Sequence, residues 1–126
     1  MELPNLPQIK NKREANITPK VLKWFKANYP DSVALEIKST ATNSIPASAL
    51  KPHQLSALLA VQTDSGLTHK IADTGHVQLP FDAFMLKHAN SFVVACFTKR
   101  GVCLAIDPNE WNGANLATNC AFRFDI

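Results

Sequence analysis

Alternation of apolar and charged side chains in residues 32–38 is the feature that most constrains this fold. Successive side chains of a strand point to opposite faces. The expected strand therefore buries its apolar side chains and presents Glu36 and Lys38 together on the other face. A carboxylate and an ammonium group are costly to desolvate at such a place. One reason to put them there is to hold a metal ion beside a nucleophilic water.

Two helices are expected around this strand. The first begins at Thr18-Pro19, a hydroxyl N-cap followed by proline at the first helical position, and ends at Pro30. The second opens at Pro52 and ends at residues 64–66, where Asp-Ser-Gly forms a turn.

The remainder of the chain predicts β-structure. Turn signals separate four expected strands, at 67–72, 81–86, 91–97 and 102–106. The last two form a hairpin, and the tail from Asp107 is mixed. The fold class is therefore α/β (α+β), with a central mixed sheet flanked by helices. The length of 126 residues fits one domain, at 18–126, preceded by a basic N-terminal arm at 1–17.

The composition narrows the class of protein. The chain is 46% hydrophobic and only 18% charged, which is typical of a globular domain. Its three cysteines form no CxxC pair, so we expect neither a disulfide framework nor a structural zinc site. Cys96 and Cys103 lie in apolar runs and are expected in the core. No signal peptide or membrane-spanning run is visible, which favours the cytoplasm.

Positive charge is concentrated in the first part of the chain. Residues 1–51 hold eight basic and four acidic residues, a net charge of +4. Such a patch suits a polyanion such as nucleic acid, and a solvated helix face with a basic tail explains it equally well. The candidate nucleic-acid-binding residues are Lys10, Lys12, Arg13, Lys20, Lys23 and Lys51.

A divalent ion at Glu36 needs a further oxygen ligand. Asp82 stands among apolar residues of an expected strand, where packing alone does not explain an acid. Asp73 precedes a turn, and a turn-forming role has about equal weight. Asp31 is more often a turn residue after a helix. The choice among the three stays open.

The start of the second helix adds two polar candidates. His53 and Gln54 follow Pro52, where a helix N-terminus favours contact with phosphate or with an attacking water. For His53 we favour simple capping, whereas Gln54 is the better functional candidate because its helix follows the strand of Glu36 directly.

These residues together resemble a known family. The stretch 35–40, the loop 43–46 and the His-Gln-Leu run 53–55 resemble RecU-type Holliday-junction resolvases of the PD-(D/E)xK nuclease superfamily. Residues 92–97 and 104–107 are similar to the closing strands of those proteins. The resemblance covers about residues 33–107 and is clearest from Glu36 to Gln54.

The resemblance implies a restriction-endonuclease-like fold and a metal-dependent endonuclease that hydrolyses DNA, with branched DNA as substrate. Glu36 and Asp82, with Asp73, would hold Mg²⁺, for which Mn²⁺ would substitute. Lys38 would orient the attacking water or neutralise charge that develops in the transition state, and Gln54 would assist. Two symmetric cuts imply a homodimer.

One feature departs from the family pattern, in which the metal-binding Asp precedes the acid-x-Lys strand. Asp82 follows it here, so the site would be permuted, with strand 81–86 beside strand 33–38. Small phage-encoded nuclease-like proteins with a Pro-Phe-Asp element are similar in this respect. Two alternatives remain: an inactive nuclease fold that binds DNA or a host protein, and a domain in which Glu36 and Lys38 are a surface ion pair.

Overall fold

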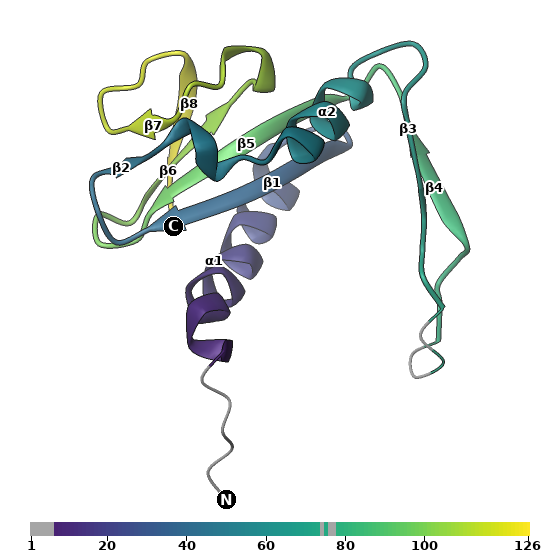
Figure 1. Cartoon of the computed structure of the whole chain (residues 1–126), viewed down its shortest axis with the longest axis horizontal. Helices are drawn as coiled ribbons and strands as arrows, with labels where there is room; N and C mark the ends of the chain where they lie inside the picture. The colour runs from purple at the N-terminus through teal and green to yellow at the C-terminus, as the bar shows by residue number, and fades with distance from the viewer. Residues whose placement is uncertain (1–6, 74, 76–77) are drawn as a thin grey trace, which may run out of the picture.

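The computed structural model describes residues 7–73, 75 and 78–126, with side chains from residue 16 onward. Figure 1 shows a sheet with one helix on each face and a separate β-ribbon at one end. The elements are α1 (Pro7–Asn28), β1 (Val33–Thr40), β2 (Ser44–Ile45), η1 (Ala47–Ala49), α2 (Pro52–Val61), β3 (Leu67–Lys70), β4 (Ala83–Leu86), β5 (Asn90–Phe97), β6 (Val102–Ile106), η2 (Pro108–Glu110), β7 (Ala114–Asn115) and β8 (Ala121–Asp125).

The main sheet has four strands in the order β1-β5-β6-β8. β1 runs parallel to β5, whereas the β5–β6 and β6–β8 pairs are antiparallel. The expected α+β class with a mixed sheet is thereby confirmed, as is the hairpin of β5 and β6. Strand β8 lies in the tail, for which the sequence predicted only mixed structure.

The two helices cover opposite faces of this sheet. On one face Ile17, Val21 and Phe25 of α1 pack against Val94 of β5. On the other face, residues of α2 pack against the neighbouring Val93. The alternation of side chains along β5 therefore explains both layers.

Helix α1 begins well before its expected start. Thr18-Pro19 is not the N-cap, because the helix starts at Pro7 and contains Pro19. Ile17 is only 6% exposed and packs in one cluster with Val21 and Phe25, four and eight residues later. Burial of this extended stripe favours a helix that continues before Pro19. Residues 7–17 of the expected arm thus belong to α1, and residues 1–6 lie outside the described part.

The expected permuted pairing of strand 81–86 with strand 33–38 is wrong. β1 pairs with β5, and β4 pairs with β3 in a two-stranded sheet of their own. Figure 1 shows this ribbon projecting from the domain. Continuous apolar character makes β5 the better neighbour, because seven of its eight residues are buried or half-buried. Within the described residues, no helix is long and apolar enough to cross a membrane.

Candidate functional site

Glu36 and Lys38 form an ion pair on the α2 side of β1. Lys38 Nζ lies 3.4 Å from Glu36 Oε2, and the two side chains are 17% and 29% exposed, respectively. The predicted shared face is therefore confirmed. β1 is an outer strand of the main sheet, so this pair stands at the margin of the sheet and not in its middle.

A groove of about 370 Å³ lies beside this pair, between β1, α2 and the β3–β4 ribbon. Glu36 contributes from β1, His53 and Gln54 from the first turn of α2, and His69 and Phe84 from the ribbon. The remaining lining is apolar, and half of it comes from α2. The groove therefore combines an apolar surface with one carboxylate, two imidazoles and an amide.

Gln54 lies in this groove, as a functional candidate should, but its side chain also has a structural role. Its Oε1 accepts a hydrogen bond of 3.0 Å from the backbone N–H of Lys51. This bond satisfies a donor at the start of α2. Capping thus explains Gln54 without any ligand, whereas His53 is exposed.

The candidate aspartates lie apart from this groove. Asp73 Oδ1 accepts a 2.9 Å hydrogen bond from the N–H of Gly75, which is the turn-forming role considered above. Asp82 is exposed, and its backbone oxygen accepts a 2.8 Å bond from the N–H of Ile71, beyond the paired part of the ribbon. Asp31 is exposed in the turn before β1.

These positions bear on the predicted metal site. Across residues 16–73, 75 and 78–126, no three His, Cys, Asp or Glu side chains gather to hold a metal ion. The structure therefore brings Glu36 and Lys38 together but does not gather Glu36, Asp73 and Asp82 around one position. The expected strand around Asp82 is shorter than the pattern indicated, since β4 begins only at Ala83.

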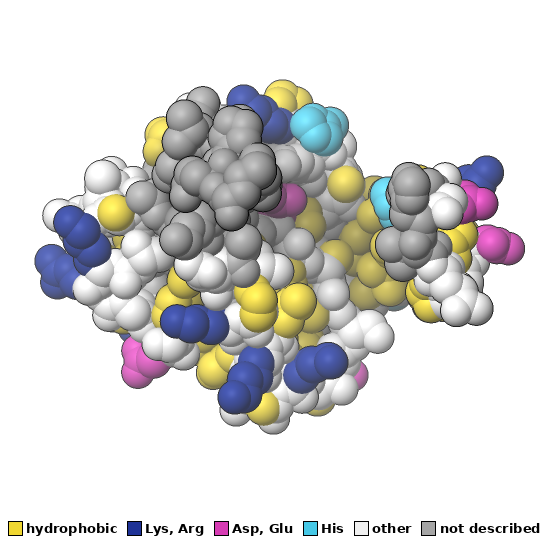
Figure 2. Space-filling view, turned by 90° about the horizontal axis from the view of Figure 1, so that it is seen from below, with side chains coloured by type: hydrophobic (Ala, Val, Ile, Leu, Met, Phe, Trp, Pro, Cys, Tyr) yellow, Lys and Arg dark blue, Asp and Glu magenta, His cyan; other side chains and the backbone are white. Residues whose placement is uncertain are grey.

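The predicted nucleic-acid-binding residues divide between the two layers. Lys51 is exposed directly before α2, in the same layer as the groove. Lys20 and Lys23 are exposed on α1, which covers the opposite face of the sheet. In Figure 2, basic side chains stand at several separate places among hydrophobic ones. The side chains of Lys10, Lys12 and Arg13 lie outside the described residues.

Two residues of the groove were not singled out from the sequence. His69 and Phe84 are partners across the β3–β4 ribbon, with ring centroids 5.4 Å apart. Both residues lie in predicted strands, but only the pairing of those strands brings their rings together. The signal that could have found them is the aromatic character of the two runs, read with the correct partner strand.

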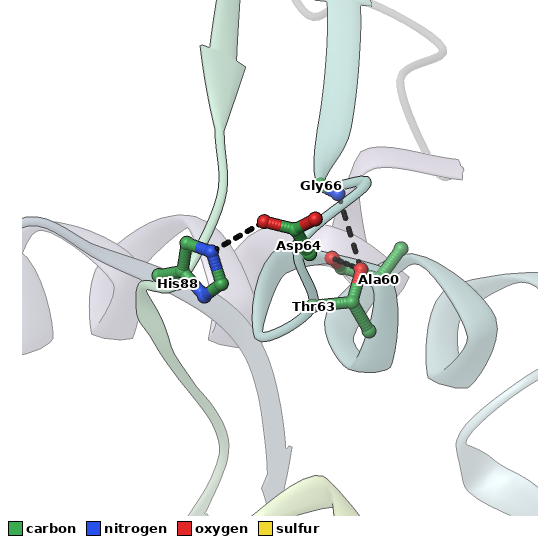
Figure 3. A network of polar contacts seen from close by, with 5 residues as sticks. All are labelled: Ala60, Thr63, Asp64, Gly66 and His88. Atoms are coloured by element: carbon green, nitrogen blue, oxygen red, sulfur yellow. Dashed lines mark hydrogen bonds and ion pairs between the residues drawn. The ribbon is translucent and has the colours of Figure 1, made fainter.

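A polar network holds the root of the ribbon, as Figure 3 shows. His88 Nε2 lies 2.8 Å from Asp64 Oδ1, which joins the segment after β4 to the segment before β3. Thr63 Oγ1 donates to the backbone oxygen of Ala60 at 2.7 Å and accepts from the N–H of Gly66 at 3.1 Å. The His88–Asp64 contact holds the two legs side by side, and the two bonds of Thr63 fix the turn that leads into β3.

The chain matches no family model, no curated protein and no solved structure. Its function is therefore inferred from its own residues and geometry.

Proposed function

We propose that this chain is a metal-dependent endonuclease that hydrolyses DNA phosphodiester bonds, selects branched DNA as a Holliday-junction resolvase does, and acts in the cytoplasm. The observation that carries the proposal is the Glu36–Lys38 ion pair, 3.4 Å apart and half-buried beside a groove. A solvated surface pair would contribute little to stability, so its placement beside a groove favours a chemical role.

The donor set around Glu36 partly fits the Mg²⁺ that this chemistry would use. Proteins often hold Mg²⁺ with one or two carboxylates, while substrate phosphates supply other ligands. Glu36 offers one such carboxylate, and Mn²⁺ would substitute. A second carboxylate ligand, from Asp82 or Asp73, would require the ribbon to approach β1. When bound, the metal would polarise the phosphate and acidify a water.

The protein side chains have separate roles in this proposal. Lys38 neutralises charge that develops at the phosphate, at a position fixed by its pairing with Glu36. Lys51 contacts the DNA backbone beside the groove without reading sequence. Paired cuts in a branched substrate require two active sites, so we propose a homodimer with twofold symmetry.

A cleavage assay on branched DNA tests the proposal. Wild-type protein should nick a four-way junction only when Mg²⁺ is present, and Glu36→Gln should abolish nicking while the fold is retained. Glu110→Gln is the matched control, because Glu110 is an exposed acid on η2. Nicking that survives Glu36→Gln, or that persists in a chelator, would contradict the proposal.

A second function is binding of DNA or a host protein without cleavage. It is favoured by the finding that no three metal-ligating side chains gather within the described residues. This function predicts that the protein binds branched DNA without nicking it, and that Glu36→Gln leaves the binding affinity unchanged.

A further inference from the structure

Phe84 and His69 form an aromatic wall that the core does not require. Phe84 is 39% exposed, and its ring lies 5.4 Å from that of His69 at an interplanar angle of 41°. Most aromatic residues of the core instead cluster under α1, on the other face of the sheet. A large ring that lines a groove and is more than a third exposed is available for stacking against a ligand.

The groove suits a small planar ligand. Its volume of about 370 Å³ lies at the low end of the roughly 300–1,000 Å³ typical of small-molecule sites. Apolar side chains of α2 line it, which favours the face of an aromatic ring system. His53 stands at the same groove and offers hydrogen-bonding nitrogens to the edge of such a ring.

Charge beside the groove favours a ligand with phosphate attached. Lys38 stands on β1 next to Glu36, and Lys51 is exposed just before the helix that lines the groove. Proteins that bind single strands combine basic side chains that contact the backbone with aromatic rings on which bases stack. Here the two rings line the groove, and the two lysines stand outside its lining, on β1 and directly before α2.

We propose that this groove holds one unpaired base of single-stranded DNA, stacked against the wall of Phe84 and His69. The inference rests on the proposed function only in taking DNA as the substrate. A base inside a duplex must first be unpaired and unstacked, at a cost of about a few kcal/mol, before it can enter the groove, so the site favours DNA in which a base is already unpaired. Figure 2 shows hydrophobic side chains in the notch between the ribbon and the rest of the domain.

Fluorescence titration of a short single-stranded DNA carrying 2-aminopurine, in buffer with a chelator, tests this site without any cleavage. Phe84→Ala should weaken binding at least about fivefold, whereas Phe84→Tyr should keep it. Met85→Ala is the matched control, because Met85 is 60% exposed and follows Phe84 on the opposite face of the ribbon. Affinity for a blunt duplex should be the same in all three variants.

Two results would overturn the inference: equal affinity for Phe84→Ala and wild type, whether or not the oligomeric state of the variant changes, or equal losses in Phe84→Ala and Met85→Ala. His69→Ala is a second variant should Phe84→Ala fail to fold. The inference is separable from the nuclease proposal. If binding depends on Phe84 but no nicking depends on Glu36, only the nuclease proposal is contradicted. If nicking depends on Glu36 but binding does not depend on Phe84, only the base-stacking site is contradicted.

Discussion

Gly66 and Leu86 approach so closely at the root of the ribbon that a Cβ at position 66 would lie 2.5 Å from the backbone oxygen of Leu86. Gly66 also has a φ of +72°, which residues with side chains rarely adopt. We expect Gly66→Ala to lower the free energy of unfolding by about 2 kcal/mol, from backbone strain and from the displaced strand. Urea denaturation measures this loss.

Gly75→Ala separates the two causes. Gly75 has a similar φ of +75°, but a Cβ there would meet none of the described residues within 4 Å. Gly75→Ala should therefore lower the free energy of unfolding only by the part that arises from the positive φ. Equal losses in the two variants would show that the close approach to Leu86 has no energetic consequence.

Asp107 is expected to make stability depend on pH. Burial raises the pKa of its carboxyl, but hydrogen bonds from the N–H and side chain of Asn109 and from Gln62 outweigh burial and lower that pKa. A carboxyl with a lowered pKa contributes stability above its pKa in the unfolded chain and loses it as pH falls through its pKa in the folded protein.

The variant Asp107→Asn should therefore lower the free energy of unfolding at pH 7 by about 1 kcal/mol, a modest loss because solvent screens part of the interaction. Its difference from wild type should shrink as pH falls below 3.8, the ordinary pKa of an aspartate. Urea denaturation across the acidic range checks this, with Asp31→Asn, an exposed turn residue, as control. A constant difference at every pH would contradict the expected pH dependence.

Local patterns predicted much of the main sheet. Alternation in residues 32–38 and the apolar runs of β5 and β6 are strong signals because both depend only on which faces are buried. The start of α1 was misplaced because Pro19 resembles a first helical residue, whereas the buried Ile17 extends the apolar stripe before it. The sequence of the tail does not predict strand β8, because the strand forms through its tertiary pairing with β6.

Only the part of the site that depends on local geometry could be predicted from the sequence. Glu36 and Lys38 are two residues apart in one strand, so geometry within the strand places them together. The prediction that Asp82 joins the site depends on which strand pairs with β1, and spacing along the chain does not determine that pairing. His69 and Phe84 meet only through the pairing of β3 with β4.

The three cysteines should differ sharply in reactivity. Cys96 and Cys103 are fully buried opposite each other in β5 and β6, whereas Cys120 is exposed. Hydrogen bonding to Cys103 and burial raise the pKa of the Cys96 thiol, which keeps it protonated and unreactive. A thiol reagent should label one cysteine in the folded protein and three after unfolding. Native labelling that survives Cys120→Ser would contradict this.

Lysines on the two faces of the sheet should contribute unequally to DNA binding. A duplex that contacts the groove beside Glu36 reaches Lys51, which precedes α2, but not Lys20 or Lys23 on the opposite layer. Lys51→Ala should therefore weaken binding and reduce the salt slope by about one, since it removes one phosphate contact. The double variant Lys20→Ala/Lys23→Ala should leave both nearly unchanged. Binding titrations over a range of salt concentrations measure the slopes. A larger loss in the double variant would place the DNA on α1, away from Glu36, and would count against cleavage at the groove.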